Sequence, residues 1–146
     1  MKRPRILFAD DSVRLLTALQ CQLESHGFEV EICTDAYMAL AQARKNKPDV
    51  MVLDIRMPAG NGFSVLERMG KIPELRHTPV IYVTGDKSAE LELQASQLGA
   101  VGLIHKPLSL PRLLDLIDLA LATGQTRAVP QKDPASETVW QIPDRA

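Results

Sequence analysis

The sequence predicts an α/β domain in which a doubly wound, five-stranded parallel sheet is flanked by five helices. Short apolar runs alternate with longer segments of helical periodicity from about residue 3 to residue 123, and this alternation is typical of βαβ units. One run, Val50 to Leu53, is apolar at every position. A strand that is apolar on both faces belongs in the middle of a sheet with helices on both sides.

Each predicted strand leads into a predicted helix. The strands are expected at residues 4–10, 28–33, 49–54, 79–84 and 101–105, and the helices at residues 12–26, 35–46, 62–71, 88–98 and 109–123. Gly27 follows the first helix as a left-handed cap. Pro48 and Pro79 each precede a strand and prevent a helix from continuing into it. Ser88 and Ser109 are suitable N-caps, because a hydroxyl can accept a bond from the free amides of a first turn.

Composition limits the kind of protein this is. The chain has 146 residues, 45% of them apolar, and a formal net charge of -1, which fits one domain with a real core. Such a balance provides no general attraction to nucleic acid or to membranes, and we expect contact with neither. The first residues lead directly into a strand, without room for the apolar region of a signal peptide. We therefore expect a cytoplasmic protein in which Cys21 and Cys33 are reduced thiols.

The character of the chain changes after residue 123. Residues 124–146 show neither helical nor strand periodicity and contain Pro130, Pro134 and Pro143. The expected division is therefore a folded domain over residues 1–123 and a disordered tail, or the start of an interdomain linker, over residues 124–146. A tail of this length is too short to form a further domain, which usually needs about fifty residues or more.

Charged and hydroxyl side chains stand at the ends of four predicted strands. Asp10 and Asp11 end the first, Asp54 the third, Thr84 the fourth and Lys106 the fifth. Ligand sites of open parallel sheets lie at the carboxyl edge, where these side chains would gather. Carboxylates this close together raise one another's pKa or recruit a cation, and hard oxygen ligands suit Mg²⁺. The plainer alternative is a helix cap, a strand-closing threonine and solvated loop charges.

The order of these motifs resembles the receiver domain of two-component response regulators. The resemblance extends over about residues 3–123 and is carried by Ile6-Leu7-Phe8-Ala9-Asp10-Asp11-Ser12, Val52-Leu53-Asp54-Ile55-Arg56-Met57-Pro58, Asn61-Gly62, Val83-Thr84-Gly85, Gly99-Ala100 and His105-Lys106-Pro107. It implies the flavodoxin-like fold of chemotaxis-type receivers, with strand order 2-1-3-4-5. It also implies a signalling domain that is not an enzyme beyond its own phosphorylation and dephosphorylation.

The resemblance implies a role for each residue at the sheet edge. Asp54 would accept a phosphoryl group from a histidine kinase or a phosphotransfer protein, and a carboxylate is chemically able to do so. Mg²⁺ would be held by Asp10 or Asp11, by Asp54 and by the main-chain carbonyl of Arg56. Lys106 would neutralise phosphoryl charge, and the hydroxyl of Thr84 would bond to a phosphoryl oxygen. Pro107 would follow a cis peptide bond that fixes the lysine.

Three positions concern how the domain would switch and how long the phosphate would last. Leu103 stands where the family usually has an aromatic side chain that reports phosphorylation, and this puts the usual coupling to Thr84 in doubt. Arg56 and Asp86 stand two residues after Asp54 and Thr84, at positions where the family tunes phosphate lifetime. We expect Arg56 and Asp86 to pair over the phosphate and hinder water; the alternative is two solvated charges.

An apolar surface for partners is a further expectation. On the last helix, Leu110, Leu113, Leu114, Ile117 and Leu121 share one stripe that is assigned to the core. Four leucines off the core stripes would form a patch over the fourth helix, fifth strand and fifth helix, and a homodimer could use it: Leu93, Leu103, Leu116 and Leu119. Scattered exposed leucines are also ordinary in proteins. His105 is expected at the rim and not as a metal ligand.

Alternative functions remain open at this point. The domain could be a phosphorylation-independent interaction module with a receiver-like fold, which the replacement of the aromatic by Leu103 would favour. It could be an N-terminal fragment of a longer multidomain regulator. A phosphatase similar to the haloacid dehalogenases would need a second acid two residues after its nucleophile, where this chain has Arg56. The cognate kinase and the signal do not follow from a fold.

Overall fold

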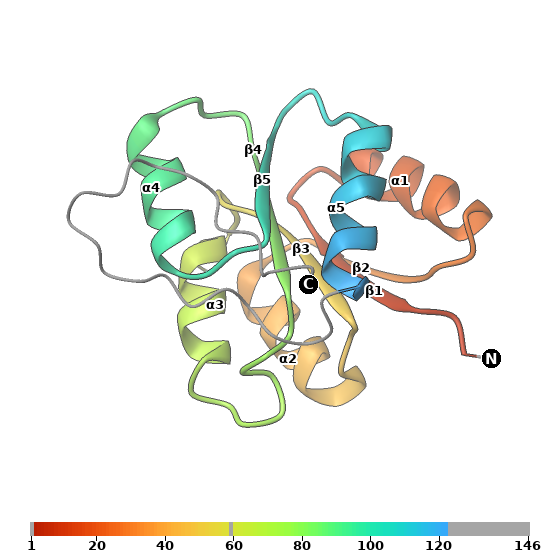
Figure 1. Ribbon diagram of the computed structural model, residues 1–146, viewed down its shortest axis with the longest axis horizontal. Coiled ribbons are helices and arrows are strands. Elements are labelled where there is room, and N and C mark those ends of the chain that lie inside the picture. Colours follow the sequence, from red (N-terminus) through yellow and green to blue (C-terminus); the bar gives the residue numbers. More distant parts are fainter. Residues whose placement is uncertain (1, 59, 123–146) are drawn as a thin grey trace.

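Strands and helices alternate without exception through the folded part of the chain (Figure 1). The computed structural model describes residues 2–58 and 60–122. Over these residues the strands are β1 (Arg5–Ala9), β2 (Glu29–Cys33), β3 (Val50–Asp54), β4 (Val80–Thr84) and β5 (Gly102–His105). The helices are α1 (Val13–Ser25), α2 (Ala36–Asn46), α3 (Gly62–Met69), α4 (Ala89–Gln97) and α5 (Leu110–Ala122).

The five strands form one parallel sheet in the order β2-β1-β3-β4-β5. This confirms the predicted fold class and strand order. The largest difference from the predicted bounds is at α3, which ends at Met69 and not at residue 71. Beyond Met69 the amide of Lys71 bonds to the carbonyl of Arg68 at 3.1 Å. That bond spans three residues, so the chain tightens into turns there and the helix stops.

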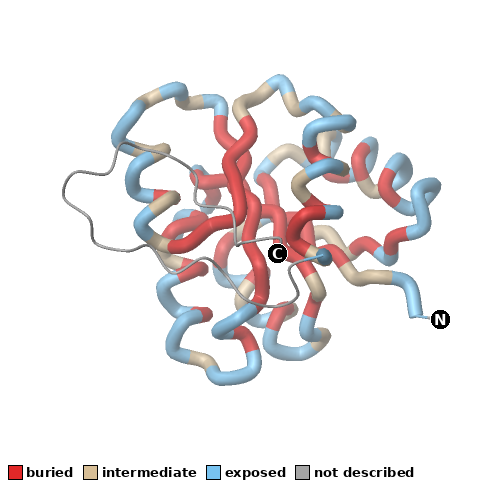
Figure 2. The backbone as a smooth tube through the Cα atoms, in the orientation of Figure 1, coloured by how far each residue is buried: buried red, intermediate tan, exposed pale blue. Residues whose placement is uncertain are grey.

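Helices cover both faces of the sheet, and the strand residues alternate between the two resulting cores. One core joins alternate strand residues to α2, α3 and α4, and the other joins the remaining strand residues to α1 and α5. Every residue of β3 is buried, as its sequence predicted. Figure 2 shows this buried centre enclosed by exposed helix surfaces. The central strand therefore carries Asp54 to the edge of the sheet on a rigid support.

Local signals in the sequence explain where helices begin and end. Gly27 has φ +94° after α1, and the amide of Phe28 bonds to the carbonyl of Leu23 at 3.2 Å, which closes the helix in the manner expected of a left-handed glycine cap. Ser88 caps α4 by accepting a bond from the amide of Glu90 at 3.1 Å. The amide of Arg112 lies 3.4 Å from the hydroxyl of Ser109 before α5.

The predicted apolar patch does not form one exposed surface, and this expectation was wrong. Leu93 is 43% exposed, but Leu103 and Leu119 are only 4% and 5% exposed. Leu103 lies in the core beneath α4, whereas Leu119 lies in the core on the other face of the sheet. Leu116 is half-buried and packs over Gly102, which has no side chain to obstruct it. Helix α5 thus buries a wider apolar face than its predicted stripe.

Other expectations concern the rest of the chain. The tail over residues 124–146 lies outside the described residues. Among the helices of residues 2–58 and 60–122, none has the length and apolar character that crossing a bilayer requires. Cys21 and Cys33 are free thiols, as predicted. Burial, followed by the charges of Asp35 and Glu31, raises the pKa of Cys33 to about 12, so this thiol stays protonated and unreactive at neutral pH.

Candidate functional site

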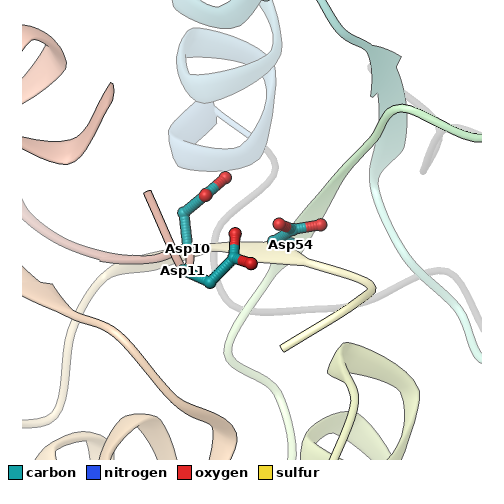
Figure 3. A group of neighbouring side chains, drawn as sticks. All are labelled: Asp10, Asp11 and Asp54. Carbon is teal, nitrogen blue, oxygen red and sulfur yellow. The ribbon is translucent and has the colours of Figure 1, made fainter. Parts of the chain in front are cut away.

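Four side chains predicted from the sequence meet at the carboxyl edge of the sheet. The strand register places Ala9 beside Leu53, so Asp10 and Asp54 follow neighbouring positions. The same register sets Thr84 beside His105, which precedes Lys106. Figure 3 shows the carboxylates of Asp10, Asp11 and Asp54 gathered at these strand ends. Parallel pairing therefore brings together side chains that lie up to 96 residues apart in the sequence, the separation of Asp10 and Lys106 (106 minus 10).

Asp10 is the anchor of the site. Its side chain is fully buried, its Oδ1 accepts a bond from the amide of Ser12 at 2.8 Å, and its Oδ2 lies 2.9 Å from Nζ of Lys106. Ser12 in turn caps α1 by accepting a bond from the amide of Leu15 at 3.3 Å. A buried charge needs a partner and hydrogen bonds, and Asp10 has both. It can therefore hold the ammonium group of Lys106 in place.

Asp54 shares this lysine. Its Oδ2 accepts a bond from Nζ of Lys106 at 3.2 Å, and its Oδ1 accepts one from the amide of Arg56 at 3.2 Å. Asp54 is 5% exposed, so it is buried but lies where the core meets the surface. The peptide bond between Lys106 and Pro107 is cis. The amide of Lys106 also bonds to the carbonyl of Thr84 at 2.8 Å, which ties this loop to β4.

The loop after β3 folds tightly against Asp54. The amide of Gly62 bonds to the carbonyl of Ile55 at 2.9 Å, and the hydroxyl of Tyr82 donates to the carbonyl of Gly62 at 3.0 Å. A methyl group added at Gly62 would stand 2.7 Å from the main-chain oxygen of Asp54. Asn61 begins α3 with a capping box that also involves Ser64. Glycine is therefore required at position 62 by the close approach of α3 to β3.

Burial and the neighbouring charges act in opposite directions on the pKa of Asp54 and on that of Lys106. Burial, and then the charge of Asp10, raises the pKa of Asp54, while Lys106 and the amide of Arg56 act in the opposite direction. Burial acts to lower the pKa of Lys106, but its contact with Asp10 and the charges of Asp10 and Asp54 outweigh that effect, so the net direction is upward. Lys106 is consequently a permanent cation at neutral pH.

The three acids present a donor set that fits a divalent cation. Asp10, Asp11 and Asp54 each offer one carboxylate oxygen, and the three oxygens lie within 4.8 Å of one another. Asp11 is exposed, and among the described residues its carboxylate has no hydrogen bond or ion pair. Hard oxygen ligands with access to water are what Mg²⁺ prefers, because it retains several waters in proteins. The residues present therefore suit Mg²⁺.

Thr84 begins a chain of hydrogen bonds that leads away from the site. Its side chain is buried, and its Oγ1 accepts a bond from the amide of Asp86 at 3.0 Å. Oδ1 of Asp86 accepts a bond from the amide of Ser88 at 2.9 Å. Because Ser88 caps α4, the threonine hydroxyl is linked through two successive bonds to the start of that helix.

Arg56 and Asp86 are paired across neighbouring loops. Nη2 of Arg56 lies 2.7 Å from Oδ2 of Asp86, with side-chain exposures of 73% and 32%. The bond from Arg56, followed by that from the amide of Ser88, lowers the pKa of Asp86. Such an exposed pair contributes little to folding stability. Its importance lies in its position, because Arg56 follows Asp54 by two residues and its amide bonds to the Asp54 carboxylate.

One side-chain contact near the site is not predicted by the sequence. Nε2 of His105 lies 2.8 Å from Oε1 of Glu92, and this contact joins β5 to α4. Both side chains are about one-third exposed. Thirteen residues separate them, so no helical or strand periodicity relates the two positions. The sequence predicts His105 as a rim residue that is not a metal ligand, and it contains no signal that would pair His105 with Glu92.

Known proteins share this arrangement over most of the chain. A family model for the response regulator receiver domain matches residues 6–118. Protein PilH of Pseudomonas aeruginosa is 36% identical over 118 residues, covering 81% of this chain and 98% of PilH. Response regulator PleD of Caulobacter vibrioides is 33% identical over 104 residues, covering 71% of this chain but only 23% of PleD. The chain therefore corresponds to about a quarter of some relatives and to nearly all of others.

Solved structures agree with the sequence relatives. Chemotaxis response regulator CheY4 of Vibrio cholerae has a TM-score of 0.76 and 28% identity, covering 82% of this chain and 99% of CheY4. A CheY-like receiver domain of Methanospirillum hungatei has a TM-score of 0.73 and 32% identity, covering 80% and 92%. Together with the geometry of the sheet edge, these similarities establish that the chain belongs to the response regulator receiver domain family.

Proposed function

We propose that the domain accepts a phosphoryl group on Asp54 and changes its contacts with partners as a result. The observation that carries this proposal is the arrangement of Asp10, Lys106 and Asp54. One ammonium group lies 2.9 Å from the buried carboxylate of Asp10 and 3.2 Å from that of Asp54. Asp10 holds the cation, so Lys106 is positioned to stabilise new negative charge at Asp54 without leaving its anchor.

The reaction follows from the groups in place. An oxygen of the Asp54 carboxylate forms a bond to phosphorus while the bond from phosphorus to an imidazole nitrogen of the donor breaks, and that nitrogen keeps the electron pair. Lys106 neutralises charge on the phosphoryl oxygens, because phosphoryl transfer depends mainly on positioning and electrostatic stabilisation. Asp10, Asp11, Asp54 and the main-chain carbonyl of Arg56 would hold Mg²⁺, which when bound supplies a second positive centre for the phosphoryl oxygens.

Phosphorylation would be reported through Thr84 and α4. A phosphoryl oxygen competes with the amide of Asp86 for the threonine, since the hydroxyl can turn to donate to the phosphate. Loss of the bond between Asp86 and Thr84 loosens the loop whose next bond orders the cap at Ser88. Leu103 is buried and makes no polar contact with this route. The polar chain thus provides coupling where the family usually has an aromatic side chain.

Helix α4 can shift on phosphorylation because few of its side chains are buried. Ala95 is its one residue that is buried, with Leu91 and Leu98 partly buried beside it. The contact between Glu92 and His105 adds a polar tie to β5. On phosphorylation we expect amide resonances of Asp86, Ser88 and Glu92 to shift in NMR spectra. Shifts that stay within the immediate surroundings of Asp54 would contradict this route.

The partner is proposed to be a histidine kinase or a histidine phosphotransfer protein, in keeping with the family. We place the receiver over residues 1–123, since α5 ends at Ala122. A cytoplasmic location is proposed in keeping with the family. PilH corresponds to the chain over nearly all of its length and PleD over a quarter. A stand-alone regulator and the receiver of a larger one are both compatible with these relatives.

The test is the intact mass of the protein after incubation with acetyl phosphate and Mg²⁺. The parent chain should gain one phosphoryl group, and Asp54→Asn should gain none, because the amide is a poor nucleophile. Thermal unfolding of both proteins checks that each is folded. A folded parent that gains no mass, with or without Mg²⁺, would favour the phosphorylation-independent interaction module.

A further inference from the structure

A cleft with a strongly basic wall opens at the amino edge of the sheet, remote from Asp54. It has a volume of about 640 Å³ and lies where the chain enters β1, where α2 runs into β3, and where α5 ends. Its cations are Lys2, Arg3, Arg5, Lys45 and Lys47, with Asp49 as the one carboxylate among its lining residues. The lining therefore has a net charge of +4, from five cations and one acid.

Four of these cations lack the partners that surface charges commonly have. Within the described part of the chain, Lys2, Arg3, Lys45 and Lys47 form no ion pair, whereas Arg5 lies 3.4 Å from Glu29. Like charges that converge without counterions repel one another and create a positive potential in the concavity between them. A multivalent anion would relieve that repulsion at several points at once.

The floor of the cleft is held in a fixed shape. The amide of Arg5 donates to Oδ2 of Asp49 at 2.8 Å, and the amide of Asp49 donates to the carbonyl of Arg5 at 2.8 Å. Nη1 of Arg5 donates to the carbonyl of Asn46 at 3.0 Å, tying β1 to the end of α2. One carboxylate oxygen and one helix carbonyl are thereby engaged with Arg5. This leaves the unpaired lysines as the groups available to a ligand.

Lys47 has an unusual backbone for its residue type. It caps α2 with φ 48°, and among the described residues it is the one that is not glycine and has positive φ. Glycine or asparagine normally occupies such a left-handed cap, because the left-handed conformation is sterically unfavourable for most other residues. Lys45 is explained by the negative end of the α2 dipole. The dipole does not explain a lysine in the left-handed cap itself, nor the cations that converge from the start of β1.

We propose that this cleft binds a polyphosphate anion, either free or as the phosphates of a nucleotide. The ligand class follows from the chemistry of the wall, since several ammonium groups and a guanidinium suit a chain of phosphates. The volume is in the range of small-molecule sites. The apolar side chain of Leu121, at the end of α5, lies at the wall where a nucleoside could rest. The site is independent of Asp54 and goes beyond the proposed phosphoacceptor role.

The experiment is calorimetric titration of the full chain with sodium tripolyphosphate at constant ionic strength and without Mg²⁺. We expect one saturable site. The double variant Lys45→Gln/Lys47→Asn should bind about tenfold more weakly or worse, since charged hydrogen bonds are lost. Asparagine is used at position 47 because it accepts a left-handed backbone. Asp54→Asn should bind as well as the parent, which separates this proposal from the phosphorylation test.

A matched control removes the same charge from the same edge of the sheet. Arg68→Gln/Lys71→Gln alters two exposed cations at the end of α3 that do not line the cleft. Screening should limit its effect to less than about threefold. Equal weakening by both double variants, or no saturable binding by the parent, would overturn the proposal. Binding of duplex DNA without saturable tripolyphosphate binding would also overturn it, in favour of a nucleic-acid backbone.

A second titration with ATP identifies the source of the phosphates. Equal affinities for ATP and tripolyphosphate would support a site that binds only the phosphate groups and makes no contact with a nucleoside. Tighter binding of ATP, lost in Leu121→Ala, would support a nucleotide site in which the helix end contacts the nucleoside. NMR shifts on titration should centre on residues 2–5 and 45–49 in either case, because these segments form the wall.

Discussion

At the carboxyl edge of the sheet one lysine contacts two of three clustered acids, whereas at the amino edge four cations that form no ion pair within the described residues line an open cleft. Asp10 is fully buried, and each of its carboxylate oxygens has a neighbour at a defined distance. The cations Lys2, Arg3, Lys45 and Lys47 are exposed. The contrast shows that a buried charge needs an ion-pair partner within the folded protein, whereas an exposed charge is stabilised by water and remains available to a ligand.

The largest difference between the two edges should appear when a lysine is removed from each. Lys106→Met leaves two carboxylates facing each other, so we expect phosphoryl transfer from acetyl phosphate to slow by about 10²-fold or more. The free energy of unfolding should fall by about 2–3 kcal/mol, less than for a fully buried pair because Lys106 is partly exposed. Lys47→Asn should change it by less than about 0.5 kcal/mol.

Urea unfolding and phosphorylation kinetics of both variants make this comparison. The pKa of Lys106 is raised in the folded protein, so its stabilisation is fully present below the ordinary value of 10.5 and is lost only as the pH rises through the folded value. At neutral pH the lysine therefore contributes in full. Similar losses of stability in Lys106→Met and Lys47→Asn would show that the two edges do not differ in this way.

Packing provides a second contrast, within the carboxyl edge itself. Gly62→Ala places a methyl group 2.7 Å from the main-chain oxygen of Asp54 and 3.0 Å from the ring of Tyr82. We expect the free energy of unfolding to fall by about 1–3 kcal/mol, as for other overpacked sites. Gly85→Ala is the control, because nothing lies within 4 Å of the added carbon. If Gly62→Ala and Gly85→Ala lower the midpoint of thermal unfolding equally, α3 can shift to accommodate the methyl group and the close contact is not destabilising.

Burial of Asp54, and then repulsion from Asp10, predict that Asp54→Asn is more stable than the parent at neutral pH. The pKa of Asp54 is raised in the folded protein, so the folded state binds its proton more tightly than the unfolded state. Stability must then fall as the pH rises from the ordinary value of 3.8 through the folded value, and the asparagine variant escapes that loss.

Asp86 behaves in the opposite sense and serves as the control. Its pKa is lowered by Arg56 and the amide of Ser88, so its contribution is present above the ordinary value of 3.8 and is lost as the pH falls through the folded value. Asp86→Asn should therefore be slightly less stable than the parent at neutral pH. Urea unfolding between pH 3 and pH 7 measures both variants, and the same sign for both would refute the assignment.

The smallest effect concerns the exposed pair of Arg56 and Asp86. If the pair shields the aspartyl phosphate from water, Arg56→Ala should shorten the lifetime of the phosphoprotein by up to about fivefold, a small effect because exposed ion pairs are weak. The free energy of unfolding should change very little, since both side chains reach solvent. Asp86→Ala should shorten the lifetime similarly, and an unchanged lifetime in both variants would leave the pair without this role.

Much of the fold and of the site follows from the sequence, because the signals are local. Apolar runs and helical periods predict the elements to within two residues, and Val50 to Leu53 predict the central strand. Parallel order then places Asp10, Asp54, Thr84 and Lys106 at one edge. The pairing of Arg56 with Asp86 was also expected, since the two loops adjoin.

Other features depend on how helices are turned and packed, which no local period encodes. Leu103 and Leu119 were expected on the surface but are buried, because α4 covers one and α5 turns the other toward the sheet. The contact between Glu92 and His105 exists only because α4 crosses beside β5.

The order of the elements and the set of charges at the carboxyl edge can be predicted from the amino-acid sequence, since both depend on periodicity and strand direction. Which of these charges form ion pairs depends on the packing of the folded chain. Asp10 and Asp54 share Lys106 because burial and register bring them within 3.2 Å of its ammonium group. Lys2, Arg3, Lys45 and Lys47 converge on one cleft because the start of β1 lies beside the end of α2 there. Proximity in space, unlike periodicity, is a property of the packed chain.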